Sequence, residues 1–372
     1  MNIALLGFGV VGRGVYDLVK NISGLQVTKV VCLEDVTLPD ATVTKDFKDV
    51  LGDDIDIVVE AMGGLHPAFE FVSAAMEAGK HVVTSNKALV ATYYDTLLPL
   101  AQKKGLCFRC TAAVGGGIGW LSELERSRRT QTITKVGGIM NGTCNYILDS
   151  MTRLGLGYGE ALKQAQEFGY AEANPTTDVE GIDTWHKVIL SSNVAFGVSL
   201  DTATVPAAGI SRITKEDVDT FTAHSLVCKL ISTGRKEQGV YSAYVQPTLV
   251  SATSLEAAVP ANYNLITLDG EASGRMSFYG QGAGRYPTAH NVVQDCADVM
   301  AGKGFYSPFG PKVAATNQNR LCYYVRGNAD PWLEENTSQR WGSAVVTRPV
   351  SVADMHAWLK DHPEAFIAAI AK

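Results

Sequence analysis

Charged and aromatic residues are scarce in this chain, at 19% and 8% of 372 residues. Long blocks of lysine and arginine are missing, and a formal net charge of -6 with a pI near 5.7 argues against a nucleic-acid partner. Also missing are apolar runs long enough to span a bilayer and a basic leader before the first glycine-rich motif. We therefore expect neither a membrane protein nor a secreted one.

Cysteine is sparse and irregularly spaced. Seven cysteines, an odd number without the spacing of a disulfide framework, favour a reducing compartment and hence the cytoplasm. Cys107 and Cys110 form a single C-x-x-C, whereas a structural zinc site needs four ligands, so zinc is not expected. Internal repeats and low-complexity segments are lacking too. With 46% hydrophobic residues, the length predicts two or three globular domains.

The charged residues that are present gather between Gly169 and Leu190. They are Glu172, Asp178, Glu180, Asp183, His186 and Lys187. Thr177 and Glu180 have the spacing of a capping box, which predicts a helix start, and the apolar residues that follow predict a face packed into a core. Asp183 and Lys187 would lie about 6 Å apart on one side of that helix. They form either a surface ion pair or a pair in a cleft, and the neighbouring apolar stripe favours the cleft.

The N-terminus reads as a dinucleotide-binding motif. A short apolar run at 2–6 leads into Gly7-x-Gly9-x-x-Gly12 and then a helical pattern. Gly7 permits a tight turn, Gly9 lets the backbone approach a pyrophosphate, and Gly12 lets the helix pack closely on the strand. The helix N-terminus supplies amides for the phosphates.

The next strand suggests which cofactor is bound. Residues 27–33 form an apolar strand that ends at Glu34, where an acid hydrogen-bonds the ribose hydroxyls and repels a 2′-phosphate. This favours NAD. Arg13 and Lys29 could each neutralise a phosphate, so NADP remains an alternative.

Further alternation of strands and helices predicts a doubly wound parallel sheet with its functional loops at the strand ends. Strands are expected at 55–61 and 81–83 with a helix at 67–78 between them. Lys87 follows the second of these strands and is either a surface lysine or a group at the cofactor edge. A glycine-rich segment at 280–288 opens a later helix and could return to the cofactor.

The middle of the chain has the pattern of a second domain. A strand at 133–139 turns into a helix whose mouth carries Asn141, Thr143 and Asn145, which either hold a polar substrate or cap the helix. Strands at 240–249 and 264–279 suggest an open α+β sheet, a kind of sheet that often pairs with a second subunit.

Together these motifs resemble the homoserine dehydrogenase family over roughly residues 1 to 300. The matching segments are GFGVVG at 7–12, SNKA at 85–88, VGGGI at 114–118, GIMNGTCNYIL at 138–148 and GQGAGRYPTA at 280–289. The resemblance implies NAD(P)-dependent interconversion of L-aspartate 4-semialdehyde and L-homoserine, on the route to threonine and methionine. It also implies a homodimer. The expected domains are a Rossmann domain at 1–134 joined by a helix at 287–303, a substrate and dimerisation domain at 135–286, and a tail at 304–372.

The resemblance also assigns site residues. Lys187 resembles the proton donor, Asp183 its partner and Lys87 a second essential lysine. Substrate binding is implied for Glu172, Asp178, Tyr170, Gly142 and Thr143; cofactor binding is implied for Gly7, Gly9, Val10, Val11, Gly12, Glu34, Gly63, Thr84, Asn86, Lys87 and Gly282. The reaction itself also requires such residues. When hydride reaches an aldehyde carbon, negative charge develops on the oxygen, and a cationic side chain can stabilise this charge and donate a proton.

Three positions depart from the family pattern. Thr111 stands where relatives have a glutamate that helps hold a monovalent cation, so that site is weakened or lost, although carbonyls remain at Val114, Gly116 and Ile118. Gly119 replaces a proline, and Asn174 replaces an aspartate. These changes leave open a divergent dehydrogenase for another small hydroxy amino acid, or an NAD-binding sensor without turnover.

The tail departs as well. Many relatives add a regulatory ACT domain, but about seventy residues after Met300 leave little room for a complete one. Residues 320–330 resemble only the first strand of such a module. We therefore expect an incomplete ACT domain and weak or no inhibition by threonine.

Overall fold

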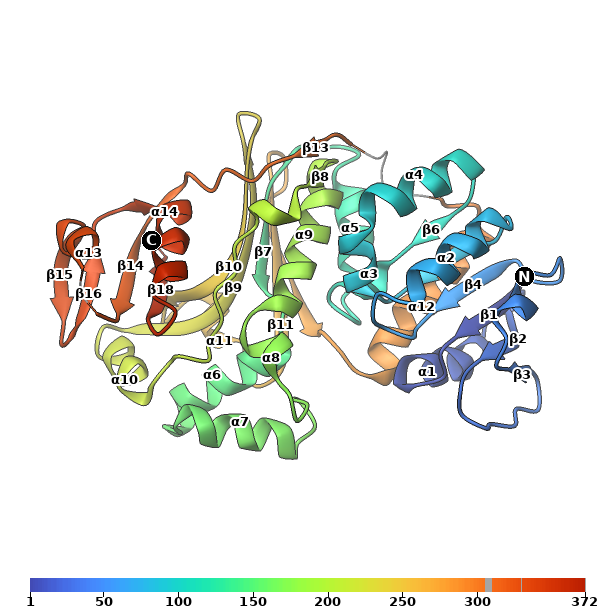
Figure 1. Ribbon diagram of the computed structural model, residues 1–372, viewed down its shortest axis with the longest axis horizontal. Coiled ribbons are helices and arrows are strands. Elements are labelled where there is room, and N and C mark those ends of the chain that lie inside the picture. Colours follow the sequence, from blue (N-terminus) through green and yellow to red (C-terminus); the bar gives the residue numbers. More distant parts are fainter. Residues whose placement is uncertain (305–309, 329, 372) are drawn as a thin grey trace. The chain divides into compact units, whose positions relative to one another are not determined.

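The computed structural model describes residues 1–304, 310–328 and 330–371, and the chain divides into two compact units (Figure 1). The first unit comprises Met1–Thr130, Asn193–Ser199 and Gly280–Lys312. The second comprises Gln131–Ser192, Leu200–Tyr279 and Val313–Lys372. In the described part of the chain, no helix combines the length and the apolar character needed to cross a membrane.

The first unit is built on a parallel sheet of six strands in the order β3-β2-β1-β4-β5-β6. The strands are β1 Asn2–Leu6, β2 Gln26–Val31, β3 Thr42–Thr44, β4 Ile57–Glu60, β5 His81–Thr84 and β6 Phe108–Arg109. The helices are α1 Val10–Val19, α2 Ala68–Glu77, α3 Lys87–Thr92, α4 Tyr94–Lys104, α5 Trp120–Ser127 and α12 Arg285–Met300, with short 3-10 helices η1 Phe47–Val50 and η2 Thr111–Ala113. This strand order confirms the predicted Rossmann fold.

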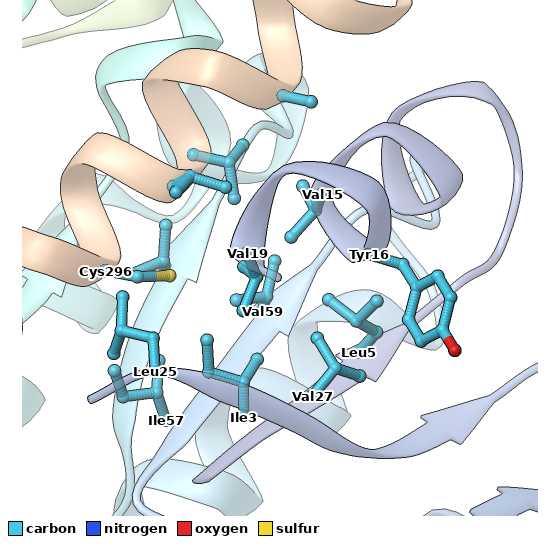
Figure 2. Packing of buried hydrophobic residues seen from close by; sticks show 14 of the residues in the cluster. Ile3, Leu5, Val15, Tyr16, Val19, Leu25, Val27, Ile57, Val59 and Cys296 are labelled. Atoms are coloured by element: carbon cyan, nitrogen blue, oxygen red, sulfur yellow. The ribbon is translucent and has the colours of Figure 1, made fainter. Parts of the chain in front are cut away.

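Helices α1 and α12 pack together over the sheet (Figure 2). Apolar residues of β1 and β4, such as Ile3 and Val59, lie beneath Val15 of α1 and Cys296 of α12. At the closest approach of the helices, a Cβ on Gly14 would lie only 2.8 Å from the Cβ of Ala289. The late helix α12 therefore completes the core of the N-terminal fold.

The second unit is built on a mixed sheet in the order β12-β11-β7-β9-β10-β18-β14-β16-β15, with β17 paired to β14. Its first strands are β7 Ile133–Ile139, β9 Leu226–Glu237, β10 Val240–Ser251, β11 Tyr263–Gly270 and β12 Gly274–Gln281. The helices are α6 Gly142–Leu154, α7 Tyr158–Glu167, α8 Thr176–Val179, α9 Ile182–Phe196, α10 Lys215–Ala223 and α11 Leu255–Ala258; the short elements β8 Ser199–Leu200, η3 Thr202–Thr204 and β13 Lys312–Val313 lie in the connections. The predicted open α+β sheet is confirmed.

The predicted capping box before α9 is wrong. Thr177 lies inside the short helix α8, which follows Pro175 and has no side-chain cap. Asn174 organises the turn instead, because its Oδ1 accepts hydrogen bonds from the backbone nitrogen (3.2 Å) and the hydroxyl (2.7 Å) of Thr176. The expectation that α9 packs into a core is correct, since Val188 and Ile189 are fully buried.

The tail forms a complete βαββαβ module. Its elements are β14 Arg320–Arg326, α13 Pro331–Glu335, β15 Thr337–Trp341, β16 Ala344–Thr347, β17 Val350–Ser351, α14 Val352–Asp361 and β18 Phe366–Ile370. The four main strands run in the spatial order fourth, first, third, second, as in a split βαβ fold. The segment that resembles the first strand of a regulatory module is thus followed by further strands and helices, so chain length no longer supports the expectation of weak threonine inhibition. Residues 305–309, 329 and 372 of the predicted tail lie outside the described residues.

Candidate active site

The glycine-rich turn after β1 has the geometry of a phosphate site. Gly7 has a φ of +93°, and a Cβ there would lie 2.9 Å from the carbonyl oxygen of Ala61. A Cβ on Gly12 would lie 2.2 Å from the carbonyl oxygen of Gly7. In contrast, a Cβ on Gly9 would meet nothing within 4 Å. Gly7 and Gly12 therefore shape the turn, and Gly9 leaves open the space that a ligand could fill.

The N-terminus of α1 can receive that ligand. Gly9 is its N-cap and makes no side-chain cap, and the first turn carries no acidic residue. Val10 is largely exposed and Val11 is half-buried. The first amides of α1 and its positive dipole end thus suit a pyrophosphate, so the residues present fit the predicted dinucleotide.

Glu34 lies beside a cation. Its Oε2 accepts a hydrogen bond of 2.8 Å from a guanidinium nitrogen of Arg13 on α1, and both side chains are substantially exposed. Lys29 is occupied elsewhere, with Nζ 2.9 Å from a carboxylate oxygen of Asp54. Of the two basic residues that complicated the prediction, the structure brings only Arg13 to Glu34.

Glu60 organises the other cofactor-edge loops and was missed from the sequence. This fully buried carboxylate at the end of β4 accepts hydrogen bonds from the backbone nitrogens of Met62 (2.8 Å) and Gly63 (3.1 Å) and from the hydroxyl of Thr84. Asn86 donates to the carbonyl of Gly64 (2.7 Å). A charged residue ending an otherwise apolar strand was the available signal.

Asn86 also places Lys87. Its Oδ1 accepts a hydrogen bond of 3.1 Å from the backbone nitrogen of Leu89 and so caps α3. Lys87 is the first residue of that helix and is half-buried. Gly63, Thr84, Asn86 and Lys87 therefore gather at the carboxyl ends of β4 and β5.

In the second unit, Asp183 and Lys187 form a buried ion pair. Nζ of Lys187 lies 2.7 Å from Oδ2 of Asp183, and only 9% of each side chain is exposed. Nζ also donates a hydrogen bond of 2.6 Å to the carbonyl oxygen of Met140 at the end of β7. This burial excludes the alternative of a surface ion pair. An ammonium that two acceptors hold in place is a preorganised cation.

Asn141 connects this pair to a second carboxylate. Its Nδ2 donates to Oδ2 of Asp183 (2.9 Å) and to Oδ1 of Asp178 (2.7 Å). Its Oδ1 accepts from the backbone nitrogen of Cys144 (2.8 Å) and so caps α6. The capping role expected for Asn141 is confirmed, and its contact with a polar substrate stays a prediction.

The remaining predicted substrate residues are nearby in the chain but differ in exposure. The hydroxyl of buried Thr143 donates to the carbonyl of Tyr170, and Tyr170 is partly exposed. Gly142 lies against backbone, since a Cβ there would be 2.5 Å from the carbonyl oxygen of Asn262. Glu172 is exposed. Asp178, unlike Glu172, is in contact with Asn141.

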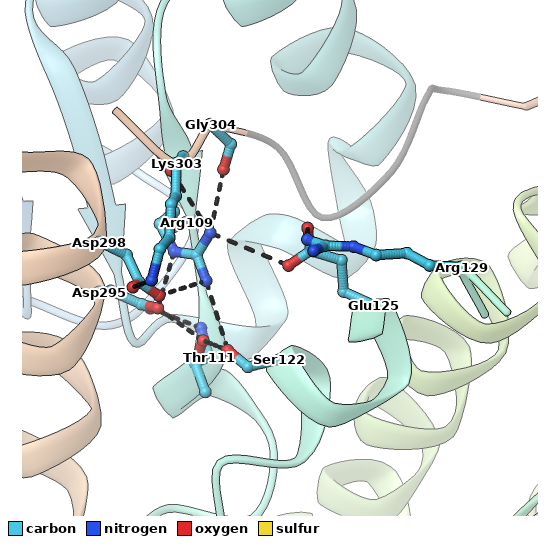
Figure 3. Close-up of polar contacts among 9 residues, drawn as sticks. All are labelled: Arg109, Thr111, Ser122, Glu125, Arg129, Asp295, Asp298, Lys303 and Gly304. Carbon is cyan, nitrogen blue, oxygen red and sulfur yellow. Dashed lines mark hydrogen bonds and ion pairs between the residues drawn. The ribbon is translucent and has the colours of Figure 1, made fainter. Parts of the chain in front are cut away.

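The loop at 114–119, the predicted monovalent-cation site, and the preceding Thr111 are held by side chains of the first unit, and Figure 3 shows the contacts of Thr111. Thr111 donates through its hydroxyl (2.6 Å) and its backbone nitrogen (2.8 Å) to the carboxylate of Asp295 on α12. The Gly116 carbonyl accepts a hydrogen bond from the side-chain amide of Asn291. A Cβ on Gly116 would lie 2.6 Å from the carbonyl of Gly282, so the loop packs tightly on that segment.

Comparisons with known proteins agree with this arrangement. The family model for homoserine dehydrogenase matches residues 120–297, and that for the homoserine dehydrogenase NAD binding domain matches residues 7–110. A homoserine dehydrogenase of Bacillus subtilis is 38% identical over 81% of this chain and 73% of its own length, and one of Corynebacterium glutamicum is 37% identical over 82% and 72%.

Solved structures give the same result over the whole chain. The crystal structure of a homoserine dehydrogenase from Thiobacillus denitrificans has a TM-score of 0.86 at 30% identity, covering 100% of this chain and 98% of that one. That of S. aureus homoserine dehydrogenase has a TM-score of 0.78 at 29% identity, with the same coverage. The chain therefore belongs to the homoserine dehydrogenase family, a family of NAD(P)-dependent oxidoreductases.

Proposed function

We propose that this homoserine dehydrogenase passes the proton of its reaction through Lys187. The observation that carries the proposal is the buried ammonium of Lys187, held between Oδ2 of Asp183 (2.7 Å) and the carbonyl oxygen of Met140 (2.6 Å). Two acceptors fix its position before substrate arrives, so it needs little reorganisation during the reaction.

The reaction requires such a group. The reduced cofactor, when bound, would supply hydride to the aldehyde carbon of L-aspartate 4-semialdehyde. The carbonyl oxygen then gains negative charge, which the Lys187 ammonium stabilises and to which it gives one proton, completing the hydroxyl of L-homoserine. In the oxidative direction neutral Lys187 takes that proton back. Asp183 holds the ammonium and keeps it oriented.

The substrate is an amino acid and carries an ammonium group of its own. We assign Asp178 to that group, with Glu172 as the second acid and Tyr170, Gly142 and Thr143 lining the pocket. Asp178 is supported by its bond to Asn141, which places its carboxylate in one network with Asp183. Lys87 is proposed as the second essential lysine, supported by its place at the start of α3.

NAD is the proposed preferred cofactor over NADP. Glu34 supports this, since an acid at the end of β2 accepts hydrogen bonds from the ribose hydroxyls and repels a 2′-phosphate. Arg13 acts in the other direction, because its guanidinium could bind that phosphate. The balance between these two residues sets the preference.

A cytoplasmic homodimer is the proposed form of the protein. All seven cysteines are free thiols, which suits a reducing compartment. Among the described strands, β12 lies at the edge of its sheet and presents Tyr279, 55% exposed and stacked 5.1 Å from Tyr263. A second copy could cover such an edge. Light scattering should give twice the chain mass; a monomer at assay concentration would remove the proposal.

One assay tests substrate and cofactor together. Reduction of NAD and of NADP is followed at alkaline pH with L-homoserine and with a panel of other hydroxy amino acids. We expect turnover with homoserine far above the panel. Turnover mainly with another member would support a divergent substrate, and cofactor binding without turnover would support a sensor.

A further inference from the structure

We propose that side chains of this protein take the place of a monovalent cation at the loop 114–119, so that the enzyme neither binds nor needs one there. Arg109, Asp295 and Asn291 are the residues concerned. The inference extends the proposed function to the support of this loop, and it can be tested without turnover. It rests on three sets of contacts in the first unit.

The first set concerns the carboxylate beside Thr111. Asp295 is 1% exposed, and both of its carboxylate oxygens are engaged by Thr111 through the bonds described above. Oδ1 also accepts a hydrogen bond of 3.0 Å from Nε of Arg109. The carboxylate that Thr111 contacts is thus paired with a guanidinium.

The second set is the surrounding charge cluster (Figure 3). Arg109 is 2% exposed and also lies 2.9 Å from Oδ2 of Asp298 and 4.0 Å from Oε2 of Glu125, and it donates to the Gly304 carbonyl (3.0 Å). Asp298 further pairs with Lys303, and Glu125 with Arg129. Three carboxylates are therefore matched by three cationic side chains.

A charge cluster in which every carboxylate already has a cationic partner disfavours an added ion. A sodium or potassium ion near Arg109 would meet a like charge where solvent screens poorly. Burial raises the pKa of the Asp295 carboxyl, against the opposing effect of Arg109.

The third set concerns the loop carbonyls. The Gly116 carbonyl, which would be a ligand, already accepts a hydrogen bond from buried Asn291 on α12. The backbone nitrogen of Gly117 donates to the Gln281 carbonyl (3.2 Å), and that of Ile118 to the Gly115 carbonyl (2.8 Å). Amide donors and backbone contacts thus fix the conformation that an ion would otherwise hold.

The test compares salts at equal ionic strength. The enzyme is freed of alkali cations by exchange into tetramethylammonium chloride, and its unfolding midpoint and sodium NMR relaxation are then measured as NaCl or KCl replaces that salt. We expect the same unfolding midpoint in all three salts and no saturable broadening of the sodium signal. Turnover with homoserine should also be equal. A saturable shift or broadening in the wild-type protein would overturn the proposal, whether or not homoserine is the substrate.

Two variants sharpen the result. Asn291→Ala frees the Gly116 carbonyl, and Arg109→Met removes the guanidinium; we expect either change to lower the unfolding midpoint and to create a stabilisation by Na⁺ or K⁺ that wild type lacks. Arg126→Met changes an exposed arginine of α5, the helix that carries Glu125; it is the control and should create none. If Arg109→Met does not fold, the comparison of Asn291→Ala with wild type tests the proposal. Variants that fold and gain no cation response would count against the assigned roles.

Discussion

Lys187 and Asp183 are separated by 2.7 Å with only 9% of either side chain exposed, whereas Lys215 and Asp219 at the same spacing and distance are 51% and 63% exposed. The two helical ion pairs therefore share chemistry and differ in burial. Only the buried pair holds an ammonium in a poorly solvated place, where it can act on a developing oxyanion.

Lys187→Ala should lower kcat by roughly 10²- to 10⁴-fold, the usual contribution of a proton donor, while NAD affinity stays nearly unchanged. Removing one partner of a buried pair also destabilises the fold, so unfolding must be measured alongside. Lys187→Arg keeps the charge beside Asp183 and should still lose most of kcat. Lys215→Ala is the matched control and should be fully active; a near-normal rate for Lys187→Ala would exclude the lysine from the mechanism.

Two variants of Asn141 can separate its role as the cap of α6 from a role in catalysis. Asn141→Ala should reduce the free energy of unfolding by about 1–2 kcal/mol through loss of the α6 cap, and it should also raise KM and lower kcat. Asn141→Ser keeps a cap acceptor but loses the amide that joins Asp178 and Asp183, so its stability should recover while its kinetics do not.

Ser351 provides the control for Asn141, because it caps α14 by accepting a 3.0 Å bond from the backbone nitrogen of Asp354. Ser351→Ala should cost similar stability with unchanged kinetics. Normal kinetics for Asn141→Ser would show that Asn141 is only a cap.

Only some of these features could be predicted from the sequence. The turn at Gly7, Gly9 and Gly12 depends on local geometry and was readable directly, as was the i,i+4 spacing of Asp183 and Lys187. The bond between Thr111 and Asp295 joins residues 184 positions apart and has no local pattern. Contacts of this kind are set by packing between distant segments.

The tail shows a second limit. Its helix α13 and its strand β15 have five residues each, and three of the five β15 residues are exposed, so these elements offer little hydrophobic periodicity to detect. Glu60 shows a third limit, since a buried carboxylate needs donors from Gly63 and Thr84 that only the fold brings together.

Replacement of Glu34 and replacement of Arg13 should shift the preference between NAD and NADP in opposite directions. Glu34→Ala should weaken NAD by roughly tenfold, the value of a hydrogen bond to a charged group, and should affect NADP less. Arg13→Ala should weaken NADP more than NAD. KM for both cofactors checks each change, with Asp35→Ala as the control, since Asp35 is exposed and pairs with Lys45. Equal effects on both cofactors in both variants would refute the specificity argument.

The buried side chain of His356 should make the free energy of unfolding depend on pH. It is 9% exposed in α14, and Nε2 lies 3.0 Å from Oε1 of Gln246 on β10, which also accepts from the hydroxyl of Tyr323 (3.3 Å). Burial lowers the pKa of His356 from 6.5 to about 4. Between these values the unfolded chain binds more protons than the folded one, so the unfolding free energy rises with pH.

On acidification through this window, His356 should therefore remove roughly 3 kcal/mol of stability, fully lost only below the folded pKa of about 4. Urea unfolding at the two ends of the window measures the loss. Carboxyl groups contribute to the same slope, so the variant His356→Gln, whose amide can still donate to Gln246 without titrating, isolates the histidine. Its stability should fall less than that of wild type, while His290→Gln, a change at an exposed position, should follow wild type. Parallel curves for wild type and His356→Gln would mean that the histidine is not held neutral in the fold.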